Sequence, residues 1–199
     1  MDFIYERYRL PDGIKIEEIT GGARYKGKVW RQIALQIYCE NGKEGFREIG
    51  HYPSGAPFLY GADERISISH TEGFLVVATR KIGADANPSE FSPSTALGVD
   101  AERSDREKVM GIRKRFLTGR EQEIVPESSL EANIIAWTCK EAMLKAGMDP
   151  AIDWLHDITI DSLPTPESEG KGTITLNGEK HPLKLVTRRS GDFIFTIAF

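Results

Sequence analysis

Alternation of apolar and polar residues predicts β-strands in the first half of the chain. Residues 14–19 alternate in this way, and residues 66–78 read as a hairpin in which a polar turn separates two strands. Between them, residues 26–40 place apolar side chains at helical spacing and end before an Asn-Gly pair, which favours a turn. Residues 81–96 are rich in small residues and proline, so we expect them to connect two halves of the chain.

The second half predicts a short strand, three helices and then further strands. The short strand covers residues 97–99. Capping boxes, in which Ser or Thr stands three residues before Glu, place two helix starts at Ser104 and Thr118. The strongest helix runs over 130–146, and Gly147 is its expected stop. Four later stretches are expected to be strands: 157–160, 172–176, 184–188 and 193–199.

Both halves therefore run through a helix into a terminal β-hairpin, and this shared order predicts the fold class. We expect an α+β protein made of two similar modules that lie side by side. The expected halves are residues 1–95 and residues 96–199. The match concerns the order of the elements, since the two halves share no sequence repeat.

Composition is that of an ordinary globular protein and argues against several classes. The 199 residues are 40% hydrophobic and 28% charged, and no stretch has the ~18–20 apolar residues that cross a bilayer. The first ten residues lack the basic and apolar regions of a secretory signal, so a cytoplasmic protein without a membrane span is expected. Two cysteines, Cys39 and Cys139, are too few for a disulfide framework or a four-ligand zinc site.

Charge argues against a nucleic-acid-binding protein but marks one local segment. The net charge is −4, whereas binding a run of phosphates needs a broad basic surface. Residues 103–120, here called the basic segment, carry seven cations: Arg103, Arg106, Lys108, Arg113, Lys114, Arg115 and Arg120. A solvated helix face and a docking surface for an acidic partner both explain this segment.

Two carboxylates at the end of the short apolar strand are the first candidate chemistry. Residues two apart on a strand share a face, so Asp100 and Glu102 point the same way. Paired oxygen ligands suit Mg²⁺, with Mn²⁺ as an alternative, and Mg²⁺ usually completes its shell with water and a substrate phosphate. Solvated surface charge, or an interaction of Glu102 with the start of the next helix, explains the same pattern.

The predicted helix over 130–146 brings further charges to one region. Trp137, Glu141 and Lys145 occupy positions i, i+4 and i+8, which form one stripe, and Lys140 lies beside Trp137. Glu141 and Lys145 could be a surface ion pair that stabilises the helix by about 0.2–0.5 kcal/mol. Alternatively, Glu141 is a third oxygen ligand and the two lysines bind phosphate.

Ser69 and His70 complete the set of candidate residues. They end a predicted strand just before a turn, where a hydroxyl group and an imidazole can meet a phosphate. A histidine at a strand end is more often structural than functional. In this chain it is one member of an ordered set with the carboxylates and the lysines.

Three motifs, in this order and spacing, resemble those of the 4′-phosphopantetheinyl transferases, specifically the larger type that activates nonribosomal peptide and polyketide synthases. They are SISH at 67–70, GVDAE at 98–102 and WTCKEAMLK at 137–145. Upstream, Gly55-Ala56-Pro57 resembles the G-K-P element of that family. The combination of GVD-x-E with W-x-x-K-E-x-x-x-K is highly specific, whereas each piece alone is modest.

The resemblance implies a pseudo-dimeric fold in a monomeric protein, with coenzyme A bound in the cleft between the halves. The implied reaction moves 4′-phosphopantetheine from coenzyme A to a serine hydroxyl of an apo acyl or peptidyl carrier protein and releases 3′,5′-ADP. The residues that match as Mg²⁺ ligands are Asp100, Glu102 and Glu141, and Glu141 is also the best-placed general base. The residues that match as coenzyme contacts are Ser69, His70, Lys140 and Lys145, and Lys145 also stabilises charge on the leaving group.

The sequence departs from the family pattern in places, and other functions stay open. Ala56 replaces the usual lysine of G-K-P, which removes one potential phosphate contact. Lys26 and Lys28 could supply the charge that meets the coenzyme's 3′-phosphate, and Lys28 is the expected contact. Acidic carrier proteins would give the basic segment a docking role. The alternatives are a non-catalytic module that binds coenzyme A or a carrier protein, and a Mg²⁺-dependent phosphohydrolase.

Overall fold

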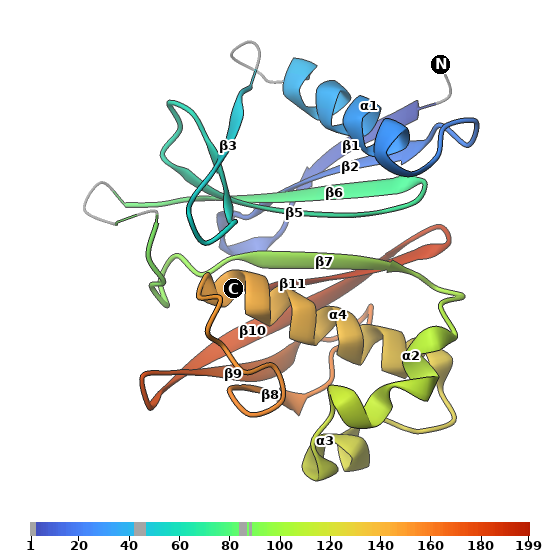
Figure 1. Ribbon diagram of the computed structural model, residues 1–199, viewed down its shortest axis with the longest axis vertical. Coiled ribbons are helices and arrows are strands. Elements are labelled where there is room, and N and C mark those ends of the chain that lie inside the picture. The colour runs from blue at the N-terminus through green and yellow to red at the C-terminus, as the bar shows by residue number, and fades with distance from the viewer. Residues whose placement is uncertain (1–2, 42–46, 84–86, 88) are drawn as a thin grey trace.

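The computed structural model describes residues 3–41, 47–83, 87 and 89–199. Within these residues the chain forms two antiparallel β-sheets and four α-helices, which confirms the expected mixture of helix and sheet (Figure 1). In the same part of the chain, no helix is both long and apolar enough to cross a membrane.

The first sheet has six strands in the order β1-β2-β6-β5-β4-β3. Their bounds are β1 Phe3–Arg9, β2 Lys15–Gly21, β3 Ile49–His51, β4 Pro57–Leu59, β5 Glu64–Thr71 and β6 Phe74–Lys81. Helix α1 (Gly27–Glu40) covers one face of this sheet with the buried side chains of Trp30, Ala34 and Tyr38. The expected helix and the expected hairpin of β5 and β6 are thereby confirmed.

Strand β6 is apolar without interruption because both faces of the first sheet are covered. Leu75 and Val77 pack on the α1 side, whereas Phe74, Val76 and Ala78 belong to a core on the opposite side. An antiparallel strand with one solvated face would alternate apolar and polar residues instead. Strand β1 and the short strands β3 and β4 were not predicted from the sequence.

The second sheet has five strands in the order β7-β11-β10-β9-β8. Their bounds are β7 Gly98–Arg103, β8 Ile158–Ser162, β9 Gly170–Leu176, β10 Glu179–Ser190 and β11 Phe193–Ala198. Helix α4 (Leu130–Gly147) packs along one face of this sheet. The short helices α2 (Lys108–Gly111) and α3 (Gly119–Ile124) lead into α4.

The two sheets pack against each other and share a core. Ile16, Phe74 and Val76 from the first sheet meet Val99 and Phe195 from the second, and all five side chains are buried. The three core clusters therefore give the layer order α1, first sheet, second sheet, α4. Figure 1 shows α1 above the first sheet and α4 against the second sheet in the lower half.

One of the two expected capping boxes is wrong and the other is confirmed. Strand β7 continues to Arg103, and Ser104 lies in a turn where its backbone N–H donates to the Asp192 carbonyl, so Ser104 caps no helix. In place of a helix that starts at Ser104, the chain forms the four-residue α2 and a 3-10 turn at Arg113–Arg115. Thr118 does begin α3, through reciprocal bonds with Glu121.

Helix α4 ends one residue later than expected. Gly147 is still helical, and Met148 takes the left-handed conformation with φ 56°. A Cβ on Gly147 would lie 2.3 Å from Ile152 Cδ1, so the glycine is needed for close packing and not for a turn.

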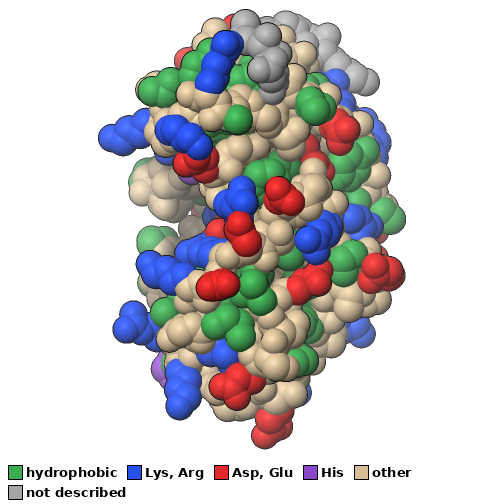
Figure 2. All heavy atoms as spheres, turned by 90° about the vertical axis from the view of Figure 1, so that its right-hand side faces the viewer, with side chains coloured by type: hydrophobic (Ala, Val, Ile, Leu, Met, Phe, Trp, Pro, Cys, Tyr) green, Lys and Arg blue, Asp and Glu red, His purple; other side chains and the backbone are tan. Residues whose placement is uncertain are grey.

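Mixed charges cover the face in Figure 2, where acidic and basic side chains are interspersed.

Candidate active site

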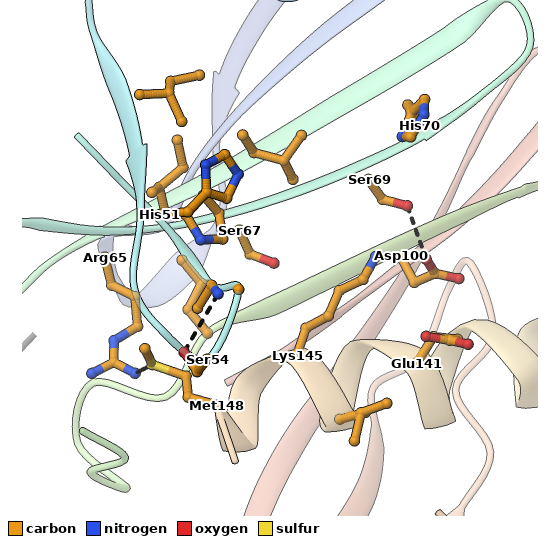
Figure 3. A pocket seen from close by; sticks show the side chains of 18 of the residues that line it. His51, Ser54, Arg65, Ser67, Ser69, His70, Asp100, Glu141, Lys145 and Met148 are labelled. Atoms are coloured by element: carbon orange, nitrogen blue, oxygen red, sulfur yellow. Dashed lines mark hydrogen bonds and ion pairs between the residues drawn. The ribbon is translucent and has the colours of Figure 1, made fainter. Parts of the chain in front are cut away.

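A cavity of about 1090 Å³ lies between the two halves (Figure 3). The α1 and β3–β5 region forms one wall, and β7 with α4 forms the other. The structure brings six of the expected site residues to this cavity: Ser69, His70, Asp100, Glu102, Glu141 and Lys145. Lys28 and Lys140 are not among the residues that line it.

Asp100 lies at the centre of the charged end of the cavity, between Ser69 and Glu141 in Figure 3. The residue is only 6% exposed. Its Oδ1 accepts hydrogen bonds from Lys145 Nζ and from Ser69 Oγ, both at 2.8 Å. Its Oδ2 is buried and has no hydrogen-bond partner among the described residues. One oxygen of Asp100 is therefore held in place while the other is free to bind a cation.

Two serines of the SISH motif attach β5 to the free edge of β7. Ser67 Oγ accepts from the Val99 N–H at 2.9 Å, and Ser69 Oγ accepts from the Ala101 N–H at 3.1 Å. These backbone donors have no strand partner because β7 is an edge strand. Since Ser69 also donates to Asp100, its only hydroxyl proton is already used. The geometry thus makes Ser69 a support for Asp100.

Glu102 shares the face of Asp100, as expected for residues two apart on a strand. Its Oε1 accepts from Trp137 Nε1 at 3.1 Å and forms an ion pair with Arg106, four residues later. The Arg106 guanidinium carbon also lies 5.0 Å from the centroid of the Trp137 ring. Trp137 therefore contacts both members of the pair, a role that the sequence did not reveal.

Glu141 projects from α4 and lines the cavity beside Asp100. Among the described residues it has no ion-pair partner within 4.0 Å. Burial of the carboxyl group raises its pKa, and the charge of Asp100 raises it further, while Lys145 and Arg106 act in the opposite direction. Of the three carboxylates Asp100, Glu102 and Glu141, Glu141 is thus the one without an ion-pair partner among the described residues.

The two lysines that flank Glu141 have different surroundings. Lys145 reaches into the cavity, where Nζ also donates to the Val99 carbonyl at 3.0 Å. Lys140 is fully buried on another side of α4, where Nζ pairs with Glu121 at 2.7 Å. A helix turns by about 100° per residue, so Lys140 cannot point into the cavity together with its neighbour Glu141. The structure therefore places Lys140, an expected coenzyme contact, away from the lining of the cavity.

His70 stands at the exposed rim of the cavity. Partial burial of the imidazole lowers its pKa, and the nearby cations Arg31 and Lys145 lower it further, while Asp100 acts in the opposite direction. A neutral imidazole can donate one hydrogen bond and accept another. His70 is thus available to a ligand in the neutral form near pH 7.

Several lining residues were missed or misplaced from the sequence. Lys28 is exposed on α1 outside the cavity wall, and Arg31 of the same helix lines the cavity instead. Ala56 lines the cavity, as its place in the G-x-P element suggests. Arg65 is 4% exposed and donates to the Glu90 carbonyl at 2.6 Å, with no carboxylate partner among the described residues. The sequence signal that could have pointed to Arg65 is its position two residues before the SISH motif.

Two of the acidic residues at the cavity, Asp100 and Glu141, fit a divalent cation. In the described part of the chain, no group of three or more His, Cys, Asp or Glu side chains is close enough to form a metal site. Asp100 offers a buried, unpartnered oxygen, and Glu141 offers a carboxylate without an ion pair. Hard carboxylate oxygens suit Mg²⁺, which needs only one or two carboxylates from the protein. Asp100 and Glu141 therefore fit the ion, whereas Glu102 is occupied by Arg106.

Comparison with known proteins adds one finding. A family model described as the 4′-phosphopantetheinyl transferase superfamily matches residues 96–198, which is more than half of the chain. The match includes β7 and α4, and thus the segments that carry Asp100, Glu141 and Lys145. A search of curated proteins gives no match to the chain.

Proposed function

Because the chain belongs to the 4′-phosphopantetheinyl transferase superfamily, we propose that it transfers 4′-phosphopantetheine from coenzyme A to a serine of an apo carrier protein. The observation that carries this proposal is the meeting of Asp100, Glu141 and Lys145 in one cavity. Membership of the superfamily supports phosphopantetheinyl transfer in general. The choice of coenzyme A and of a carrier protein of the acyl or peptidyl type is our inference from the motifs.

The transfer forms one phosphorus–oxygen bond and breaks another. The serine hydroxyl of the carrier attacks the β-phosphate of coenzyme A, and the bond from that phosphorus to the bridging oxygen breaks to release 3′,5′-ADP. Glu141 lines the cavity beside Asp100 and accepts the serine proton directly or through water. Lys145 stabilises the negative charge that develops on the departing phosphate.

Magnesium is the proposed cofactor, and Asp100 and Glu141 would hold it. When bound, Mg²⁺ neutralises charge on the pyrophosphate. The buried free oxygen of Asp100 supports this assignment, because an unpartnered buried carboxylate oxygen is costly without a cation. Manganese has similar ligand preferences and is expected to substitute for magnesium. Glu102 is the third expected ligand, although its partner is Arg106 in the structure.

We propose that the basic segment docks an acidic carrier protein, but with fewer of its seven cations than the sequence suggests. Arg113 is buried and donates to the Asn133 side chain at 2.5 Å, so it serves the fold. Arg103 is paired with Asp105 and Arg106 with Glu102. Four cations stay exposed on this segment: Lys108, Lys114, Arg115 and Arg120. These cations belong to the segment whose Arg106 lines the cavity, and their charge attracts an acidic partner to that segment.

We also propose that the halves 1–95 and 96–199 are two related modules that form a pseudo-dimer within a monomeric protein. Each half contains an antiparallel sheet and a long helix on its outer face. The cavity uses both halves of one chain, so a single copy supplies the whole site.

A mass measurement tests the transferase activity. With coenzyme A and Mg²⁺, the protein is expected to add about 340 Da to an apo carrier protein, the mass of the transferred group. Glu141→Gln should remove this activity, while Glu127→Gln, a change at an exposed residue away from the cavity, should retain it. An unchanged mass across apo acyl, peptidyl and aminoacyl carriers, with a correctly folded protein, would refute the proposal.

A further inference from the structure

Arg106 holds one of the three site carboxylates in an internal ion pair. Its guanidinium pairs with Glu102 Oε1 and lies over the Trp137 ring, whose Nε1 donates to the same oxygen. The side chains of Arg106 and Glu102 are 28% and 15% exposed. An ion pair that is shielded in this way is screened less by salt than a fully exposed pair.

The other two carboxylates lack such a guanidinium. Asp100 is held through Oδ1 alone, and its Oδ2 has no hydrogen-bond partner among the described residues. Glu141 has no ion pair in the same part of the chain, and its pKa is raised. Of the three site carboxylates, Glu102 is thus the one whose charge is neutralised by an arginine of the same chain.

A divalent cation and a guanidinium compete for the same carboxylate. A carboxylate binds magnesium through oxygen lone pairs, and the Arg106 and Trp137 donors point at Glu102 Oε1. For Glu102 to become a close ligand, the positive charge of Arg106 has to move away. Asp100 is paired with Lys145 through Oδ1, but its buried Oδ2 has no hydrogen-bond partner among the described residues, and Glu141 has no ion pair in that part of the chain.

We propose that Arg106 is a positioning residue that withholds Glu102 from the metal in the free protein. Asp100 and Glu141 would hold magnesium in the free protein, and Glu102 would become a third ligand once Arg106 has moved away from it. This inference rests on the metal site of the proposed function. Arg106 lines the cavity and also belongs to the basic segment, so the acidic surface of a docked carrier protein is the partner that draws it away.

Carrier docking and metal binding are therefore coupled. A partner that binds the released form of Arg106 raises the affinity of the protein for the metal. The metal raises the affinity for that partner by the same factor. The free protein holds its metal weakly, and the full set of ligands forms only when the acceptor is present.

The test measures Mn²⁺ binding by electron paramagnetic resonance, without coenzyme A or carrier protein. Arg106→Gln is expected to tighten Mn²⁺ binding by about 5–50-fold, a range typical of coupling between sites. Glu102→Gln alone should change the affinity by less than about twofold, because Glu102 is already withheld. Adding Glu102→Gln to Arg106→Gln should remove the gain, which is the signature of direct competition.

Arg115→Gln is the matched control. It removes the same charge from the same segment, and Arg115 is exposed. If long-range repulsion of the metal by the basic segment were the cause, both substitutions would tighten Mn²⁺ binding equally. Equal effects of the two substitutions would overturn the proposal. So would a loss of affinity in Glu102→Gln as large as that in Asp100→Asn, because Glu102 would then be a ligand in the free protein.

Two further measurements separate the parts of the proposal. An apo acyl carrier protein is expected to tighten Mn²⁺ binding to the unaltered protein but not to Arg106→Gln, and equal responses would overturn release by docking. If Asp100→Asn leaves Mn²⁺ binding unchanged, the metal site of the proposed function itself fails. Thermal melts of every variant confirm that the fold is retained.

Discussion

Glu141 is charged at a position where the fold favours its protonated form. Burial and the neighbouring Asp100 raise its pKa above the ordinary value of 4.5. A carboxyl whose pKa is higher in the folded than in the unfolded chain stabilises the fold below the unfolded value, and this contribution is lost as pH rises through the folded value. At neutral pH the metal-free protein therefore carries a destabilising charge at its site.

Glu141→Gln is expected to stabilise the metal-free protein at pH 7, because glutamine carries no charge there. The melting temperature should rise by about 1–3 °C, as befits a change of at most about 1 kcal/mol in a chain of this size. The gain should shrink as pH falls and vanish well below the ordinary value of 4.5, where the glutamate is protonated in both states. Thermal melts in the presence of a chelator measure the effect, and Glu127→Gln is the exposed control. A destabilised Glu141→Gln protein at pH 7 would contradict this account.

The two lysines beside Glu141 should separate stability from ligand binding. Lys140→Met leaves the buried Glu121 without its cation, and breaking a buried pair in this way costs about 3–5 kcal/mol of unfolding free energy. Lys145→Met should cost much less stability, since that side chain is 31% exposed, but should weaken coenzyme A binding. Urea denaturation and calorimetric titration with coenzyme A measure the two effects. The reverse order of stabilities would be inconsistent with the structure.

Sequence reasoning found the residues of the cavity only where a local rule sets direction. Asp100 and Glu102 share a face because strand residues two apart do so, and Glu141 and Lys145 share one because helix residues four apart do so. Lys140 was misplaced because its partner Glu121 comes from another helix, and no local pattern reveals that contact. The ion pair of Glu102 and Arg106 could have been predicted, because Arg106 stands four residues after Glu102.

At the scale of elements, the close approach of β7 to α4 sets the position of the site. An added Cβ on Gly98 would lie 1.9 Å from the Ala142 carbonyl oxygen and 2.6 Å from the Ala146 nitrogen. Neither backbone atom can move without shifting the helix. Gly98 thus allows the strand that carries Asp100 to lie directly against the helix that carries Lys145.

Gly98→Ala is expected to destabilise the protein by about 1–3 kcal/mol, the usual range for an overpacked interior. It should also reduce the transferase activity, because the strand and the helix that meet at Asp100 and Lys145 are pushed apart. Gly111→Ala is the control, since nothing lies within 4 Å of its added Cβ and the residue is helical. This change should be neutral or stabilise by about 0.5–1 kcal/mol. Denaturant melts compare the two, and equal stabilities would contradict the close approach.

Element boundaries failed where strand pairing overrode local signals. The Ser104–Glu107 pattern predicts a helix start, but β7 pairs with β11 through Arg103, and the Ser104 N–H bonds to Asp192. The Thr118 box worked because no strand competes for those residues. The long helices α1 and α4 were found because their apolar spacing extends over several turns.

At the scale of the whole molecule, the site cannot be assigned to one half. The matched family region, residues 96–198, carries the carboxylates and Lys145, but Ser69 and His70 come from β5 of the other half. The order of elements predicted two halves with a helix and strands each. The packing of the two sheets and the resulting cavity could not be predicted, because they depend on contacts between residues that are distant in the sequence.

The shared core means that the peptide connection is not what holds the two halves together. If the chain is cut between β6 and β7, the first fragment exposes Ile16, Phe74 and Val76, and the second exposes Val99 and Phe195. Each fragment alone should then aggregate or melt without cooperativity, because its inner sheet face meets water. Co-expressed fragments should co-purify and regain activity, whereas two independently stable fragments would contradict the shared core. The fold thereby offers a natural place to build a two-part reporter, whose signal depends on the concentration of both pieces.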